Sequence, residues 1–200
     1  MIVAVAATKG GVGKTTLAVG LAEALAARGD GTVVLVDLDR MAEGGAADWA
    51  DLAETPGPSL AAQVVTGTPG DLGGLARLDA AHVVLDTPPA DPAVTRAAIA
   101  ACDLCVIAAG ARAADLRRVA GVATAAAGPP VVVVLTMTRP GFAATAEARE
   151  ALTAAGLTVA AASIPLRERI ARAFGRDLTP AALAPFVELT DELVPTTKEK

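Results

Sequence analysis

The sequence predicts a single α/β domain, with a mainly parallel, twisted sheet that is flanked by helices on both faces. Short runs of β-branched residues alternate with helical patterns along the chain, and alternation of this kind builds parallel sheets. Hydrophobic residues make up 53% of the 200 residues and aromatic residues only 2%, so the core rests mainly on small aliphatic side chains. Alanine favours helix and valine favours strand, and both are abundant here.

Six apolar segments are predicted strands. The segment at 32–36 is an unbroken apolar run, which is typical of a strand that is buried on both faces of a sheet. The run at 131–135 is the strongest of the set. The predicted strands lie at 2–7, 32–36, 83–85, 104–108, 131–135 and 159–164.

Helical patterns fill most of the stretches between these strands. The first helix, predicted at 15–28, carries Leu17 and Leu21 on one side and ends before a glycine. Residues 55–74 are rich in Gly, Pro, Thr and Ser and are predicted to form a loop with a short helix. The remaining helices are predicted at 43–53, 92–101, 112–127, 142–155, 166–175 and 180–193.

The expected organisation is one domain over residues 1–194, followed by a flexible tail at 195–200. No basic leader precedes the first apolar run. The most apolar uncharged stretch is interrupted by Gly128-Pro129-Pro130, so no membrane span is expected. Two cysteines give no disulfide framework, which favours a reducing compartment. We therefore expect a cytoplasmic protein.

Charge is distributed unevenly along the chain. The formal net charge is −5, yet residues 101–176 contain nine arginines and five acidic residues, a local net charge of +4. A basic face is therefore possible on an acidic protein, and such a face is typical of contact with nucleic-acid phosphates. The candidate residues are Arg169, Arg172 and Arg176, which share one side of the predicted helix at 166–175, and Arg117 and Arg118 from an earlier helix.

A phosphate-binding loop is predicted between the first strand and the first helix. The segment Lys9-Gly10-Gly11-Val12-Gly13-Lys14-Thr15-Thr16 fits the P-loop pattern with its first glycine replaced. Glycines let the backbone curl so that its N–H groups point at phosphate oxygens, and the helix N-terminus adds partial positive charge. Lys14 would then reach the β- and γ-phosphates, and the Thr15 hydroxyl would bind Mg²⁺.

Acidic residues follow the next two predicted strands. Asp37 and Asp39 come after the strand at 32–36, and Asp86 comes after the strand at 83–85. The carboxyl ends of parallel strands are where ligands bind in sheets of this class, and Asp86 is therefore the candidate that holds Mg²⁺, directly or through water.

The loop resembles the deviant Walker A motif, KGGxGK[ST], of the ParA/MinD family of ATPases. Lys9 stands where a phosphate loop does not need a lysine, and the family has its signature lysine there. The segment Asp86-Thr87-Pro88-Pro89 likewise resembles the end of the family's Walker B strand. The resemblance extends over essentially the whole chain and is strongest to small ParA partition proteins, including the ParF-like ones.

This resemblance implies roles for particular residues. Lys9 would contact the nucleotide of a partner subunit, Asp39 would orient the attacking water, and Asp37 would support the Mg²⁺ shell. In family members, Pro-Gln usually follows the second of these two aspartates, whereas Arg40-Met41 follow Asp39 in this chain. The loops after the last two strands usually hold adenine, which makes Pro165 a candidate contact.

The function implied is that of a ParA-type ATPase for plasmid or chromosome partition. ATP and Mg²⁺ are the expected cofactors, and hydrolysis to ADP and phosphate is the expected reaction. The expected partners are a second copy of the chain in an ATP-dependent sandwich dimer, double-stranded DNA bound without sequence preference, and a ParB-like centromere-binding protein that stimulates hydrolysis. A nucleoid-associated protein without a membrane partner is therefore expected.

Three other functions on the same scaffold remain open. A MinD-like positioning regulator would need a basic amphipathic C-terminal helix, whereas residues 187–200 are acidic and contain Pro195. An ATP-dependent ligase conflicts with Lys9, and an iron–sulfur carrier ATPase needs exposed bridging cysteines. Cys102 and Cys105 are instead expected to pack between a helix end and a buried strand.

Overall fold

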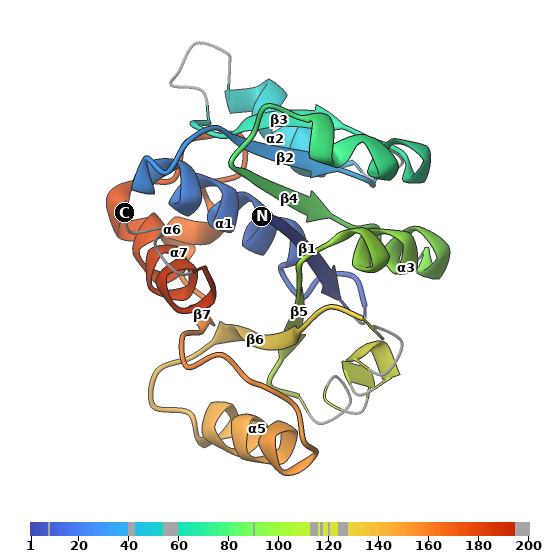
Figure 1. Ribbon diagram of the computed structural model, residues 1–200. Helices are drawn as coiled ribbons and strands as arrows, with labels where there is room; N and C mark the ends of the chain where they lie inside the picture. The colour runs from blue at the N-terminus through green and yellow to red at the C-terminus, as the bar shows by residue number, and fades with distance from the viewer. Residues whose placement is uncertain are drawn as a thin grey trace, which may run out of the picture.

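The fold is built on one seven-stranded parallel sheet with the strand order β3-β2-β4-β1-β5-β6-β7 (Figure 1). The computed structural model describes residues 1–7, 9–39, 43–53, 60–89, 91–112, 116, 118–119, 121–123 and 128–194. The strands are β1 (Ile2–Ala7), β2 (Val33–Asp37), β3 (Gln63–Thr66), β4 (His82–Asp86), β5 (Leu104–Gly110), β6 (Val131–Thr138) and β7 (Ile164–Pro165). All their pairings are parallel, which confirms the predicted fold class.

Helices cover both faces of this sheet (Figure 1). One face packs against α1 and α7, and the other packs against α3 and α5. The helices are α1 (Lys14–Arg28), α2 (Ala46–Ala53), α3 (Pro92–Ala101), α5 (Ala143–Ala154), α6 (Glu168–Ala171) and α7 (Pro180–Leu193), with a 3₁₀ helix, η1, at Pro69–Arg77. Within the described residues, no helix is long and apolar enough to cross a membrane.

The unbroken apolar runs follow from this two-sided burial. Side chains alternate between the faces of a strand, so Val3 and Val5 of β1 join the core beside α1, while Ala4 joins the core beside α3. All three are at most 2% exposed. A strand in this position has no polar face, which is why the predicted strands lack polar alternation.

The helix pair α1 and α7 is packed unusually closely at Gly20. A Cβ atom on Gly20 would lie only 2.2 Å from Cδ1 of Phe186. The Phe186 ring is fully buried and fills the space that a side chain at position 20 would need. Glycine is therefore required in the middle of α1 by packing, although it is a poor helix former.

The last predicted strand, at 159–164, is mostly wrong. Val159 forms an isolated bridge to Val133, and regular pairing is limited to β7. Between Val159 and β7, side chains form the hydrogen bonds that a neighbouring strand would otherwise provide to the backbone. Arg149 donates to the carbonyl oxygens of Ala160 and Ala161, and Glu192 accepts the N–H groups of Ala161 and Ala162. An irregular segment is stable when its polar groups are paired in this way.

The predicted loop at 55–74 contains a strand, β3, that was not predicted. Its four residues pair with β2 at the sheet edge and include no long apolar run. Glu23 of α1 holds the preceding chain, because its carboxylate accepts the N–H groups of Ala61 and Ala62. The short helix predicted in this stretch is η1, which begins with a capping box formed by Thr68 and Asp71.

The predicted helices differ most from the structure at 166–175. Only α6 is helical there, and the chain then turns through Gly175, whose φ of +69° favours glycine. The described part of the predicted helix at 112–127 is helical at 116, 118–119 and 121–123. The predicted tail at 195–200 lies outside the described residues.

Candidate functional site

The predicted phosphate loop joins the carboxyl end of β1 to the first turn of α1. Gly11 and Gly13 have φ angles of +76° and +79°, which glycine adopts at little cost, and Gly13 is the N-cap of α1. The loop is attached to the sheet by Thr136 at the end of β6, whose hydroxyl donates to the carbonyl oxygen of Val12 at 2.7 Å. The N–H groups at the start of a 15-residue helix therefore lie in a fixed loop, as phosphate binding requires.

Lys14 and Asp86 form a buried ion pair at the centre of the site. The Nζ atom of Lys14 lies 2.5 Å from Oδ1 of Asp86, and their side chains are 6% and 0% exposed. The two residues come from α1 and β4, and the sheet brings them together because β4 lies next to β1. Charge-assisted bonds of this kind are strong where water is excluded.

The carboxyl group of Asp86 is under opposing influences. Burial raises the pKa of Asp86 above its ordinary value, and the negative charge of Asp37 acts in the same direction. The Lys14 ammonium and the Thr15 hydroxyl lower that pKa and so favour the carboxylate. Its ionisation therefore depends on a nearby cation.

The residues around Asp86 fit the Mg²⁺ site that the sequence predicts. Its second oxygen, Oδ2, is buried and has no hydrogen bond of normal geometry within the described part of the chain. A buried oxygen without a partner is costly, and a hydrated Mg²⁺ would satisfy it. Thr15 lies in the first turn of α1 beside this carboxyl group and could supply a hydroxyl ligand.

Asp37 and Asp39 occupy the carboxyl end of β2, next to Asp86. Asp37 is 2% exposed, and its two oxygens accept the N–H groups of Asp39 at 2.8 Å and Ala47 at 2.9 Å. Asp37 therefore anchors the turn after β2 and the start of α2, and its support of Mg²⁺ stays a prediction. Asp39 is half-buried, and its predicted role in orienting water also stays a prediction. Arg40 and Met41 lie outside the described residues.

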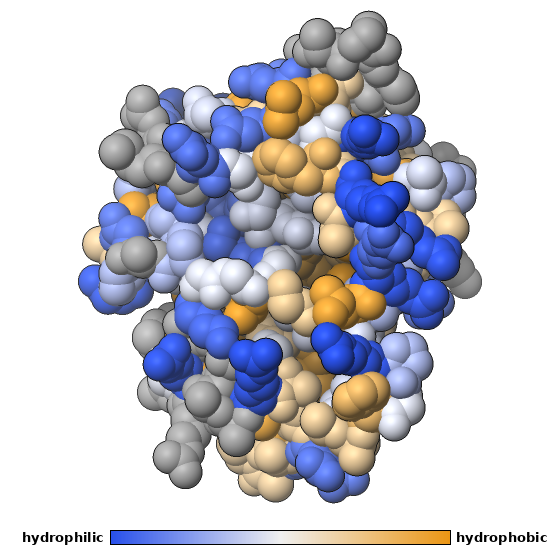
Figure 2. All heavy atoms as spheres, turned by 180° about the vertical axis from the view of Figure 1, so that it is seen from behind, coloured by the Kyte–Doolittle hydropathy of each residue, from blue (hydrophilic) through white to orange (hydrophobic). Residues whose placement is uncertain are grey.

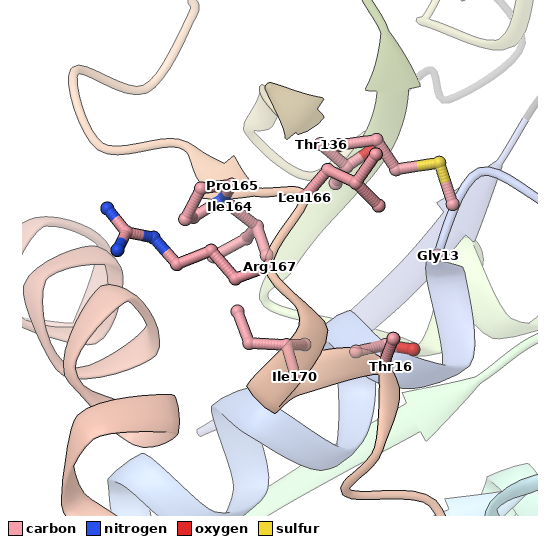
Figure 3. A pocket seen from close by; sticks show the side chains of 10 residues that line it. Gly13, Thr16, Thr136, Ile164, Pro165, Leu166, Arg167 and Ile170 are labelled. Carbon is pink, nitrogen blue, oxygen red and sulfur yellow. The ribbon is translucent and has the colours of Figure 1, made fainter. Parts of the chain in front are cut away.

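An apolar hollow of about 120 Å³ lies beside the phosphate loop. Figure 3 shows Thr136 and Leu166 on one side of it and Thr16 and Ile170 on the other, while the guanidinium of Arg167 points away. Pro165, the predicted adenine contact, lines the same hollow with Ile164. The predicted contact of Pro165 with adenine stays a prediction.

Lys9 lines a second, wider hollow of about 410 Å³ on the other side of the loop. Arg112 and Arg139 line this hollow too, together with Phe142 and Leu166, which are 60% and 46% exposed. Half-exposed apolar side chains beside several cations form a surface that a second protein chain can cover.

Two local features of the site, at Met137 and Thr87, were not predicted. Met137 has a φ of +54°, lies at a register shift between β6 and β7, and lines both hollows. A non-glycine residue in this conformation costs about 1–2 kcal/mol, so its surroundings hold it there. Thr87 donates to the carbonyl oxygen of Val5 at 2.9 Å and joins the end of β4 to β1. Nothing in the sequence near either residue indicates these contacts.

The predicted arginines do not form one helical face. Arg169 lies in α6, whereas Arg172 and Arg176 belong to the turn after it, because the helix ends at Ala171. All three are exposed, and Arg172 pairs with Glu168. Figure 2, which is turned by 180° from Figure 1, shows a band of hydrophilic residues at the right, the side to which the turn brings α6. Arg118 is exposed on the described helical residues near 118, and Arg117 lies outside the described residues.

The cysteines are placed as expected for packing. Cys105 is 0% exposed in β5, and burial raises its pKa to about 12. Burial also raises the pKa of Cys102, which is half-buried at the end of α3. A bridging iron–sulfur cluster needs accessible thiolates, whereas Cys105 is inaccessible and burial disfavours the thiolate form of both cysteines. Within the described residues, no group of three or more His, Cys, Asp and Glu side chains could hold a metal.

Comparison with known proteins agrees with this site. Residues 3–181 match the family described as the CobQ/CobB/MinD/ParA nucleotide-binding domain. A curated relative, maintenance of carboxysome distribution protein A of Gloeobacter kilaueensis, is 41% identical over 116 residues. The match covers 53% of this chain and 47% of that protein, so the chain matches about half the length of this relative.

Solved structures share the fold at low sequence identity. MinD of Aquifex aeolicus matches with a TM-score of 0.75 at 15% identity, and the match covers 99% of this chain and 98% of that one. A putative plasmid partition protein of Borrelia burgdorferi, bound to AMPPNP, matches with a TM-score of 0.74 at 17% identity, covering 95% and 96% of the two chains.

Proposed function

The chain belongs to the CobQ/CobB/MinD/ParA family of nucleotide-binding ATPases, and we propose that it is a ParA-type ATPase that switches between a monomer and an ATP-bound homodimer. One observation carries the proposal. A buried lysine of the phosphate loop meets a buried carboxylate where the carboxyl ends of β1 and β4 adjoin, and among the described residues the second carboxylate oxygen has no hydrogen bond of normal geometry. This arrangement is costly by itself and becomes useful when a phosphate and a divalent cation are bound.

Each charged residue of the site has a distinct role in this proposal. The loop N–H groups and Lys14 bind the β- and γ-phosphates, so Lys14 transfers its contact from Asp86 to the nucleotide. Asp86 and Thr15 would hold Mg²⁺, which would offset negative charge on the phosphates, and Asp37 would support this shell. Asp39 orients the attacking water and accepts its proton.

Lys9 contributes to the site of a second copy of the chain. It lines the wide hollow together with Arg112 and Arg139, beside the exposed side chain of Phe142. A cation supplied across an interface stabilises charge on the phosphate that is transferred. Phe142 and Leu166, exposed in the monomer, would become buried around it in the dimer.

The homodimer is proposed to bind double-stranded DNA without sequence preference. Arg169 and Arg176 are exposed and can contact backbone phosphates, whereas Arg172 pairs with Glu168. A ParB-like partner would stimulate hydrolysis and release the dimer, and plasmid or chromosome partition in the cytoplasm is the proposed role. The similarity to a carboxysome distribution protein favours a broader proposal, in which different proteins of the family position different cargoes.

Co-sedimentation with DNA tests this proposal directly. The chain should pellet with duplex DNA in the presence of ATP and Mg²⁺, less with ADP, and least without nucleotide. Binding should fall steeply as salt is raised, because phosphate contacts release counterions. DNA binding that is absent or indifferent to nucleotide would contradict the DNA part of the proposal.

Paired arginine variants locate the contact surface. Arg169→Ala combined with Arg176→Ala should weaken DNA binding about 10-fold or more, since each phosphate contact contributes to affinity. The matched control is Arg77→Ala with Arg96→Ala, which removes the same charge from exposed positions on η1 and α3. Equal losses in the two pairs would show that net charge alone decides binding, and would refute the proposed face.

A further inference from the structure

Trp49 connects the helix α2 to the arginine-bearing turn at 172–176. It is the chain's only tryptophan and is 2% exposed. Its indole Nε1–H donates to the carbonyl oxygen of Arg176 at 2.8 Å, and its ring lies 5.4 Å from the Phe174 ring at an interplanar angle of 59°. Tilted aromatic pairs at this distance are favourable, and a buried indole N–H needs such a partner. The contact is therefore specific in both position and orientation.

The turn also touches α2 through its backbone. A Cβ atom on Gly175 would lie 2.8 Å from Cβ of Leu52, so the turn passes as close to α2 as glycine allows. The Phe174 ring reaches toward Gly44 before α2, where its Cζ lies 4.0 Å from the position of a Cβ. A turn packed this closely cannot shift relative to α2 without loss of the Trp49 contacts.

The start of α2 depends on the nucleotide site. Oδ2 of Asp37 accepts the N–H of Ala47 in the first turn of α2, and Trp49 follows two residues later. Asp37 pairs in register with Asp86 on the neighbouring strand. A charge placed beside Asp86 therefore acts directly on the carboxylate that orients α2.

The arginine-bearing segment meets the nucleotide site at its other end. Ile170 and Ala171 of α6 line the apolar hollow beside Gly13 and Thr16 (Figure 3). The segment from α6 to the turn thus contacts the site at the hollow and again, through Trp49, at α2. Arg172 pairs with Glu168 inside the same segment, so this ion pair moves with the segment and does not attach it to α2.

We propose that Trp49 is a positioning residue that couples nucleotide binding at Asp37 and Asp86 to the orientation of the arginine-bearing turn. Rearrangement of the Asp37 carboxylate shifts the first turn of α2, and the Trp49 contacts carry that shift to Phe174 and Arg176. This inference rests on the proposed function, because it assumes that Mg²⁺ and nucleotide bind at the carboxylates. It adds the contacts through which nucleotide binding would change the orientation of the arginine-bearing turn.

The fluorescence of Trp49 tests the first half of the route. Addition of AMP-PNP with Mg²⁺ should change its emission saturably, with a midpoint equal to the Kd measured by calorimetry. Mg²⁺ alone should leave the emission unchanged. Phe174→Ala removes the ring contact but keeps the fluorophore, and should reduce the amplitude of the response by at least half while nucleotide still binds. An unchanged Trp49 signal at saturating nucleotide, with binding heat present, would overturn the inference.

DNA affinity tests the second half. In the wild-type chain, nucleotide should raise duplex affinity about 10-fold, within the usual range of coupling between sites. Trp49→Phe keeps a ring but loses the indole N–H, and should reduce this ratio to about two-fold with an unchanged nucleotide Kd. The exposed control Leu78→Ala should keep the wild-type ratio.

The outcomes separate failure of the inference from failure of the proposed function. Absence of calorimetric binding of AMP-PNP by the wild-type chain would refute the proposed function. Nucleotide binding with a full coupling ratio in Trp49→Phe and Phe174→Ala would overturn only the role of Trp49. Circular dichroism and thermal unfolding identify a variant that has lost its fold, and the Trp49 emission of the wild-type chain decides the question independently of any variant.

Discussion

Lys14 and Asp86 are 72 positions apart in the sequence, and their side chains meet at 2.5 Å within the protein. The pair occupies the place where the nucleotide phosphates are proposed to bind. Each charge is the other's partner in this buried pair, which offsets part of the cost of removing both from water. Nucleotide and Mg²⁺ would separate the pair and give each residue a ligand of opposite charge.

Lys14→Ala is expected to abolish ATP binding and to destabilise the fold. The variant leaves Asp86 buried without its cation, which costs about 3–5 kcal/mol of unfolding free energy. The loss should be smaller at pH 5 than at pH 8, because protonation neutralises the carboxyl group. Denaturant unfolding and calorimetric titration with ATP measure the two effects. Lys14→Ala with Asp86→Asn should recover much of the stability but no binding, and recovery of binding would contradict the role of Lys14.

Lys9→Ala is expected to leave the monomer intact and to remove ATP-dependent dimerisation or hydrolysis. Lys9 is half-buried in the wide hollow, so its loss should cost less unfolding free energy than the loss of the buried Lys14. Light scattering after size exclusion, with and without ATP, measures the dimer. Arg112→Ala, in the same hollow, is the control for a general loss of positive charge. A Lys9→Ala protein that dimerises and hydrolyses ATP normally would refute the proposed contact across subunits.

Asp39→Ala is expected to bind ATP normally and to hydrolyse it about 10²–10⁴-fold more slowly, since a general base contributes that much. The variant should accumulate as the ATP-bound dimer and stay on DNA. Phosphate release under single-turnover conditions gives the rate, and Asp79→Ala, an exposed carboxylate between η1 and β4, is the matched control. Normal turnover in Asp39→Ala would move the role of orienting water to another residue.

Gly20→Ala is expected to destabilise the fold by about 1–3 kcal/mol despite the better helix propensity of alanine. The added Cβ would lie 2.2 Å from the Phe186 ring, so α1 and α7 must separate or the ring must move. Thermal or denaturant unfolding measures the loss. Phe186→Leu should offset part of it in a double-mutant cycle, and strict additivity of the two changes would contradict the packing explanation.

Native thiol labelling should distinguish the two cysteines. With a pKa of about 12, Cys105 has on the order of one thiolate in 10³ to 10⁴ molecules at pH 8.5, and it is fully buried. Alkylation should therefore modify Cys102 slowly and leave Cys105 unmodified in the folded chain. Both should react after unfolding in guanidinium, as mass spectrometry would show. Rapid labelling of both cysteines in the folded chain would favour the alternative function of an iron–sulfur carrier ATPase.

Local patterns in the sequence predicted the parts of this protein whose chemistry is contiguous. The phosphate loop lies between a strand and a helix as predicted, because its glycines, its lysine and the helix start follow one another directly. The central strands were also predicted, because burial on both faces leaves uninterrupted apolar runs. The edge strand β3 and the irregular segment at 159–163 were not predicted. Their backbones are held by hydrogen bonds to the side chains of Glu23, Arg149 and Glu192, which lie elsewhere in the sequence.

The sequence by itself determined the fold class, the phosphate loop and the candidate carboxylates, because each is encoded in a few neighbouring residues. Only the tertiary structure decided which of these groups meet. The order of strands places Asp86 against Lys14, and the packing of a turn against α2 places Arg176 against Trp49. Contacts between distant segments depend on how the whole core closes, and no local pattern carries that information.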